Sequence, residues 1–216
     1  MTLTFRCTLV ELSTHSLLGF VHCYANELTA IATVLLALFG LITFIVIGWQ
    51  GHLLRRQLEL QTLTGLYTEW NSKEMLEKRV YSFVSDKPTD EELEQVEAVL
   101  EFLEKLASFY RHGVLTRKLI WDTFGWYVLR YYFYNSGEER FPDEPGKGNI
   151  EQIRAKWDHD DTLYCDLKIL YDKLLMMECR RRRRTKEAVR ESLRKEHNKF
   201  IKAEQKLYDE YGKERG

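Results

Sequence analysis

Hydrophobic side chains dominate one uninterrupted stretch of the chain, residues 28–49, which contains no charged residue. As a helix this stretch spans roughly 33 Å at about 1.5 Å per residue, which matches a hydrocarbon core of about 30 Å. A soluble helix nearly always keeps a polar stripe, whereas the threonine hydroxyls here can bond to carbonyls of their own helix. A cleaved signal peptide has a shorter apolar region behind a basic start. The stretch therefore predicts a transmembrane helix.

Lysine and arginine residues lie mainly after the predicted span. Arg55 and Arg56 follow it closely, and only Arg6 precedes it. Because basic residues beside a membrane helix favour the cytoplasmic side, we expect a single-pass protein with its N-terminus outside and its C-terminal domain in the cytoplasm. Residues 1–24 are either part of the outer segment or leader sequence upstream of the natural start.

Helical periodicity continues beyond the span. Leu53 and Leu60 recur at near-heptad spacing, so we expect the membrane helix to run on into the following segment. Asn71 with Glu74 resembles a capping box, which predicts a restart and a short helix over residues 72–84.

A clearer start signal opens the next helix. Thr89 and Glu92 form a T-x-x-E capping box, and Gly113 occupies the usual position after a helix end. The apolar face between them carries Leu93, Val96, Leu100, Leu103, Leu106 and Tyr110. Thr116 begins an aromatic-rich helix to about residue 134, whose charged residues are too costly for a second membrane span. We expect this helix to be the core of a soluble domain.

The rest of the chain also reads as helix. A loop with two prolines occupies residues 135–149, and helical sequence resumes at Ile150 with a break near Asp158–Asp161. The predicted fold class is all-α, with one N-terminal transmembrane helix that continues into a cytoplasmic helical bundle and a long charged C-terminal helix. The predicted organisation is an extracytoplasmic segment at 1–27, a transmembrane helix at 28–49, a helical cytoplasmic domain at 50–179 and a basic C-terminal helical tail at 180–216.

Charge separates the body of the chain from its tail. The whole chain has a formal net charge of −1, but residues 180–216 contain 14 basic and 7 acidic residues. A basic tail indicates internal docking or an anionic partner, whereas overall neutrality argues against a dedicated nucleic-acid-binding domain. No C-x-x-C pair exists among the four cysteines, which argues against a zinc ribbon or a thioredoxin motif.

The most conspicuous local feature is a run of five arginines, Arg180, Arg181, Arg182, Arg183 and Arg184. On a continuous helix these side chains would circle the axis and form a collar of positive charge. Three interpretations of the collar are open. It is a solvated surface without a partner, or it pairs with the acidic helix that contains Glu97 and Glu104 or with a partner protein. The third interpretation is that it binds anionic lipid headgroups. Nucleic acid is the least favoured partner.

The tail also carries a weak heptad pattern. Its apolar positions are Val189, Leu193, Phe200, Ala203 and Leu207, with Glu196 interrupting the series. The pattern is typical of a coiled coil between two chains, or of one helix face docked on the chain's own body. Self-association through the C-terminal helix is therefore one prediction.

Two sets of polar residues are candidates for chemistry. The sequence Asp158-His159-Asp160-Asp161 resembles a metal phosphohydrolase pair, but its ligand set is incomplete, and acids at a helix start also serve as caps. Asp122 and Arg130 lie eight positions apart on one face of the aromatic helix, so we expect buried polar residues that need partners. The sequence contains no P-loop, G-x-G-x-x-G, G-x-S-x-G or H-E-x-x-H motif. We therefore predict no metal and no cofactor, and we name no catalytic residue.

Three segments carry a resemblance to a known family. The apolar block ANELTAIATVLLALFGLITFIVIGWQ is followed by the WNS and IWDTFGWYVLRYYF segments. Over about residues 25–135 the chain resembles a family of uncharacterised bacterial membrane proteins with one N-terminal span and a helical cytoplasmic domain of unknown function. The resemblance implies placement in a bacterial inner membrane and supplies no activity.

The sequence favours a membrane-anchored, non-catalytic interaction or regulatory module whose partner is unknown. The lipid bilayer is the expected partner of the span, and a protein or an anionic lipid is an expected partner of the soluble part. The alternatives are anionic-lipid or nucleic-acid binding through Arg180–Arg184, and an enzyme with a site near His159.

Overall fold

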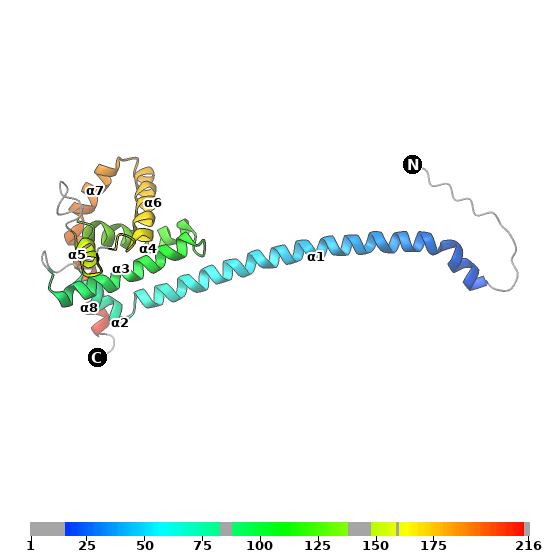
Figure 1. Cartoon of the computed structure of the whole chain (residues 1–216), viewed down its shortest axis with the longest axis horizontal. Coiled ribbons are helices and arrows are strands. Elements are labelled where there is room, and N and C mark those ends of the chain that lie inside the picture. The colour runs from blue at the N-terminus through cyan, green and yellow to red at the C-terminus, as the bar shows by residue number, and fades with distance from the viewer. Residues whose placement is uncertain (1–15, 83–87, 138–147, 159, 214–216) are drawn as a thin grey trace. The chain divides into compact units, whose positions relative to one another are not determined.

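The computed structural model describes residues 16–82, 88–137, 148–158 and 160–213. Every regular element in these residues is an α-helix, which confirms the predicted all-α class (Figure 1). The helices are α1 (Ser16–Trp70), α2 (Lys73–Tyr81), α3 (Asp90–Arg111), α4 (Arg117–Asn135), α5 (Asn149–Lys156), α6 (Cys165–Arg182), α7 (Lys186–Lys195) and α8 (His197–Lys213).

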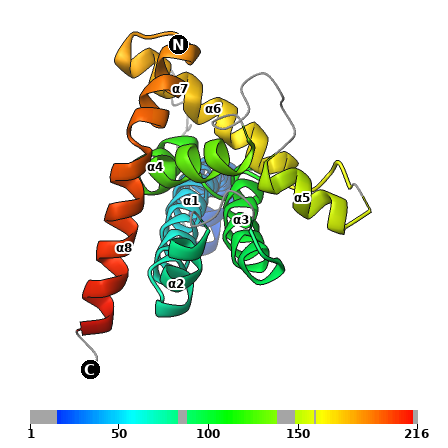
Figure 2. The ribbon, with the colours of Figure 1, turned by 90° about the vertical axis from the view of Figure 1, so that its left-hand side faces the viewer.

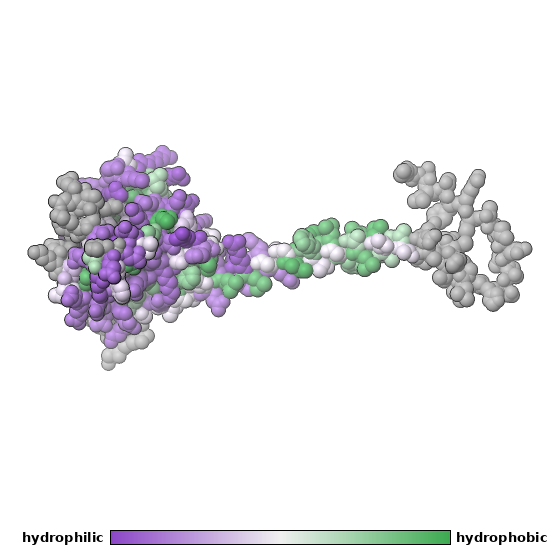
Figure 3. Space-filling model, viewed as in Figure 1, coloured by the Kyte–Doolittle hydropathy of each residue, from purple (hydrophilic) through white to green (hydrophobic). Residues whose placement is uncertain are grey.

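The chain divides into two compact units, Met1–Arg56 and Gln57–Gly216. Within the described residues one helix is long and apolar enough to cross a membrane, over Thr29–Trp70. The Thr33 and Thr43 hydroxyls donate to carbonyls four residues earlier, at 2.8 and 2.7 Å, so the hydroxyls in this apolar segment are satisfied within the helix, as expected. Figure 3 shows the hydrophobic side chains along this part of α1. By length and composition, α1 could span a membrane.

The second unit is organised around α3 and α4. The Thr89 hydroxyl accepts from the Glu92 backbone N–H at 3.3 Å, and the Glu92 carboxylate accepts from the Thr89 N–H at 2.8 Å, which confirms the predicted capping box. Thr116 caps α4 in the same way through the Leu119 N–H. Because α4 buries most of its residues from Phe124 onward, it is the core helix that the sequence predicted.

Helix α6 packs against both α3 and α4 and completes the core (Figure 2). The residue before this helix is Tyr164, which has a positive φ of 61°. The Tyr164 side chain makes no capping hydrogen bond to the first turn of α6. The Glu104 carboxylate of α3 accepts instead from the Asp166 and Leu167 N–H groups, at 3.1 and 2.6 Å. A distant carboxylate thus satisfies N–H groups that the first helical turn leaves unpaired.

One local prediction needs correction. The cap of α2 is Ser72, whose hydroxyl accepts from the Met75 N–H at 3.2 Å, and not Asn71. The Asn71 side chain instead donates back to the Tyr67 carbonyl and prolongs α1. The break predicted near Asp158–Asp161 is confirmed, because α5 ends at Lys156 and α6 begins at Cys165.

Candidate functional site

The arginine run lies at the end of α6 and does not form the predicted collar. Arg182 is the last helical residue, and Arg183 adopts a left-handed conformation with φ of 53°. The Arg184 N–H then donates to the Cys179 carbonyl at 3.0 Å, the bond that closes a helix C-terminus. The side chain of Thr185 caps α7 through the Ala188 N–H. The run therefore spans the last turn of α6 and the turn that leads to α7.

The turn divides the five arginines into two groups. Arg181 donates to both Glu178 oxygens at 2.8 Å, and Arg182 pairs with the same carboxylate. Among the described residues, no carboxylate pairs with the exposed side chains of Arg180, Arg183 and Arg184. Two arginines thus belong to the fold, and three present charge to solvent.

The acidic face of α3 is not the partner of these arginines. Glu97 accepts from the Trp157 indole at 2.6 Å and from Lys156 at 3.3 Å, and Glu104 caps α6. The carboxylates that the run does meet are Glu178 and Glu196. Internal pairing exists, but it lies within α6 through Glu178 and between α6 and the C-cap of α7 through Glu196, and not between the run and α3.

The buried side chain of Arg130 on α4 also contacts Glu196. The Arg130 side chain is 5% exposed, and its Nη2 lies 2.5 Å from Glu196 Oε2. Its guanidinium stacks over the Trp126 ring at 4.2 Å, and burial lowers the pKa of Arg130 despite the attraction of Glu196. Asp122, predicted on the same buried face, is exposed instead. Eight residues advance a helix by about 80° beyond two turns, which is enough to move one of the two side chains out of the core.

A pocket of about 240 Å³ lies where α4, α6 and α7 meet. It is lined by Trp121, Trp126, Leu129, Arg130, Glu178, Arg181, Arg182, Leu193 and Glu196. Three arginines and two glutamates face this space, and the carboxylates already hold three guanidinium groups. The arrangement can hold helices together, and it leaves a small excess of positive charge.

The deepest polar cluster was not found by sequence reasoning. Arg79 of α2 is 0% exposed, and its Nη2 and Nε lie 2.5 and 2.7 Å from Glu204 Oε2 of α8. Its Nη1 donates to the Trp70 carbonyl at 3.0 Å, and the Tyr131 hydroxyl donates to the same Glu204 oxygen at 3.1 Å. The cluster joins α8 to the ends of α1, α2 and α4.

Aromatic rings enclose the Arg79 guanidinium. Its central carbon lies 4.3 Å from the Trp70 ring centre and 4.9 Å from that of Tyr127, distances at which a cation is attracted to a ring face. Burial raises the pKa of Glu204, although Arg79 opposes the shift. The pKa of Arg79 is also raised although burial opposes that shift, so the guanidinium stays charged beside a carboxylate that is costly to bury.

One spacing pattern in the sequence indicates the partners of both Arg130 and Arg79. Glu196, Phe200 and Glu204 recur at intervals of four, so they lie on one face of a helix. Phe200 is 1% exposed and packs against the rings of Trp126 and Tyr131, at 4.6 and 5.3 Å between centroids. In the heptad interpretation Glu196 was an interruption, whereas in the structure it is part of the contact.

The predicted heptad positions contribute to the chain's own core. Val189, Leu193 and Phe200 are buried in it, and only Leu207 among the large members of the series is exposed. The Tyr134 hydroxyl donates to the Leu193 carbonyl at 3.0 Å and further fixes α7 on α4. The structure thus shows one helix face docked on the body.

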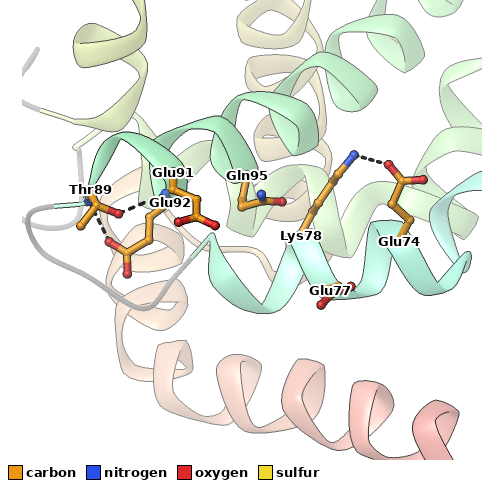
Figure 4. Close-up of a pocket in the computed structure, with 7 residues that line it drawn as sticks. All are labelled: Glu74, Glu77, Lys78, Thr89, Glu91, Glu92 and Gln95. Atoms are coloured by element: carbon orange, nitrogen blue, oxygen red, sulfur yellow. Dashed lines mark hydrogen bonds and ion pairs between the residues drawn. The ribbon is translucent and has the colours of Figure 1, made fainter.

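A second hollow of about 510 Å³ lies between α2 and the start of α3 (Figure 4). Its lining residues are Glu74, Glu77, Lys78, Thr89, Glu91, Glu92 and Gln95. Lys78 reaches Glu74 at 2.5 Å, and this contact lowers the pKa of the carboxyl group. The remaining carboxylates make the surface acidic without bringing three ligands together for a metal within the described chain.

The predicted polar cluster before α6 is only partly visible. His159 lies outside the described residues. Asp160 accepts from the Thr162 N–H and hydroxyl at 2.8 and 2.6 Å, and these bonds lower the pKa of Asp160. Asp160 therefore serves as a turn cap, the role that the sequence left open beside metal binding.

One comparison with known proteins gives a match. The model of the family described as Domain of unknown function (DUF4760) matches residues 27–136, just over half of the chain. Neither a curated protein nor a solved structure matches. The matched residues are nearly those of the resemblance seen in the sequence, and they contain Arg79 and Arg130 but neither Glu196 nor Glu204.

Proposed function

We propose that this chain, which belongs to the DUF4760 family because the family model covers just over half of it, is a membrane-anchored helical interaction module. The observation that carries the proposal is the docking of the C-terminal helices on the family domain by two ion pairs, Arg79–Glu204 and Arg130–Glu196. These pairs use the buried charges of the domain to hold helices together. A non-catalytic, regulatory role accounts for that use.

The anchor in this proposal is the apolar part of α1. Its length and composition suffice to cross a bilayer, and Arg55 and Arg56 support a cytoplasmic domain by the distribution of basic residues. The sequence resemblance supports placement in a bacterial inner membrane. Single-pass topology with the N-terminus outside follows from these arguments.

Alkaline carbonate extraction of membranes from cells that express the full chain tests the anchor. We expect the chain to remain in the membrane pellet, and its release into the supernatant would contradict anchoring. Topology is tested in a chain that keeps only one cysteine. Cys7 alone should react with a membrane-impermeant maleimide in spheroplasts, whereas a cysteine at the exposed position of Lys173 should react only after lysis.

The interaction role is tested by crosslinking in native membranes. We expect the wild-type chain to capture a defined partner. Glu204→Ala should loosen α8, so this variant should capture the same partner with altered yield. A Glu210→Ala chain is the matched control, because Glu210 is exposed and, among the described residues, pairs with Lys206. Purified protein that turns over a nucleotide or a phosphoester, and loses turnover with His159→Ala, would replace this proposal with the enzyme alternative.

A second function, anionic-lipid binding, is favoured by the exposed Arg180, Arg183 and Arg184. The full chain in neutral nanodiscs should bind vesicles that contain phosphatidylglycerol more strongly than pure phosphatidylcholine vesicles, and less so as salt increases. Replacing the three arginines by glutamine should abolish the difference. The matched control replaces the exposed Lys168, Lys173 and Lys202 by glutamine, since it removes equal charge. Equal losses in both variants would exclude a specific site.

A further inference from the structure

Helices α7 and α8 form a C-terminal arm, residues 186–213, that contacts the family domain through one repeated pattern. Glu196, Phe200 and Glu204 lie four residues apart, and each has its own counterpart on the domain. The two carboxylates meet Arg130 and Arg79, and the phenyl ring between them packs on aromatic side chains. Figure 2 shows α8 running beside α2.

The receiving surface and the arm belong to different parts of the chain. The family model includes Arg79, Trp126, Arg130 and Tyr131 but ends at residue 136, before the arm. With the arm in place Arg79 is 0% exposed, and its carboxylate partner Glu204 comes from the arm, so a buried Arg79 without that carboxylate would be strongly unfavourable. The surface therefore requires an acidic, aromatic helix as its occupant, and the arm is the occupant whose fit the structure shows.

The connection between α6 and the arm contains a strained residue. Arg183 has φ of 53°, a left-handed conformation that a residue with a Cβ atom disfavours and that glycine adopts freely. The run from Arg180 to Lys186 contains no glycine and no proline, so the sequence here is compatible with uninterrupted helix. Straightening this turn would relieve the strain and move the arm away from the domain that precedes it.

We propose that two copies of the chain exchange their C-terminal arms. The arm of each copy occupies the surface of the other, with Glu196, Phe200 and Glu204 in the same contacts, while Arg183 becomes helical and joins α6 to α7. Exchange of identical elements costs little because every contact is remade, and anchoring in one bilayer raises the local concentration of the second copy. The inference rests on the proposed interaction function and names its partner as this chain.

Photocrosslinking from position 200 distinguishes exchange from docking within one chain. The full chain, with Phe200 replaced by p-benzoylphenylalanine, is expressed in two differently tagged forms and irradiated in native membranes. Exchange predicts a product of twice the chain mass that carries both tags. The same photoreactive residue at the exposed position of Lys202 is the control and should give no such product.

The buried site can reject the larger side chain, so Ile201, which is only partly buried, provides a second labelling position. A product of twice the chain mass from either position 200 or position 201 supports exchange. Crosslinks confined to single chains at both positions would overturn it. Carbonate extraction is unaffected by either result, so failure of the exchange proposal is distinct from failure of membrane anchoring.

Substitutions at the strained residue give an independent test. Arg183→Gly relieves the strain of the turn, whereas Arg183→Ala removes the same charge and keeps the strain. The crosslinked dimer should be about fivefold less abundant with Gly than with Ala, the ratio expected from about 1 kcal/mol. Arg183 is exposed, so both variants should fold. Equal dimer yields from the two variants would contradict the role of this turn.

Discussion

The Arg79 guanidinium lies 2.5 Å from the Glu204 carboxylate although 125 residues separate them in the sequence. Both side chains are at most 2% exposed, and the Glu204 Oε1 atom has no hydrogen-bond partner among the described residues. The pair is thus costly to bury and very costly to break. It ties the last helix of the chain to the family domain.

Removing the ring between the two ion pairs should release the last helix. Phe200→Ala is expected to lower the free energy of unfolding by about 3–5 kcal/mol, because it empties a buried aromatic site. Leu207→Ala is the matched control, since Leu207 is 41% exposed on the same helix and should cost much less. Chemical unfolding of the full chain in detergent measures both. A loss below about 1 kcal/mol for Phe200→Ala would show that α8 is not docked.

The pairs that hold α6 and its turn should weaken in acid. Burial of Glu178 opposes ionisation, but bonds from Arg181 and Arg182 outweigh it and lower the pKa of the carboxyl group below its ordinary 4.5. The stability contribution of Glu178 is therefore fully present above that value and is lost as pH falls through the lowered pKa. The wild type should exceed Glu178→Gln in stability at neutral pH, and the difference should shrink in acid.

The stability contribution of Glu204 should have the opposite pH dependence to that of Glu178. Burial raises the pKa of Glu204 above 4.5, so its protonation-linked contribution is present below the ordinary value and is lost as pH rises through the raised pKa. Unfolding curves of wild type, Glu178→Gln and Glu204→Gln across the acidic range measure both trends. Parallel pH dependences for the two variants would contradict the assignment of the two environments.

The remote cap of α6 should be measurable at its two N–H groups. Glu104→Ala removes the acceptor for Asp166 and Leu167, and we expect a loss of about 1–2 kcal/mol, as for other helix caps. Glu101→Ala is the control, because Glu101 is exposed on the same helix. Amide hydrogen exchange at Asp166 and Leu167 should increase only in the Glu104 variant. Unchanged protection there would show that these groups have other partners.

Local signals in the sequence were sufficient for much of the fold. The capping box at Thr89 and Glu92 and the cap at Thr116 are decided by neighbouring residues, so their prediction was correct. The turn at Arg183 was not predictable in this way, because no residue there favours a left-handed conformation. Packing of Val189 and Leu193 against the core imposes that turn over the local preference for helix.

The candidate site shows the same division between local and distant effects. Arg130 and Asp122 are both charged residues of the aromatic helix, but only Arg130 is buried, because the two side chains lie on different sides of the helix. Arg79 is one of several charged residues on the short helix α2, and its carboxylate partner Glu204 lies 125 residues later in the sequence. Only the four-residue spacing of Glu196, Phe200 and Glu204 hinted at it.

A double-mutant cycle on Arg79 and Glu204 tests the docking of the C-terminal helices on the family domain most directly. Arg79→Met, Glu204→Met and the double variant are compared with the wild-type full chain in detergent by chemical unfolding. Each single change should cost about 3–5 kcal/mol because it leaves one buried charge alone, and the double change should cost less than the sum by about 2 kcal/mol or more. Additive losses, with no coupling between the two positions, would contradict the account.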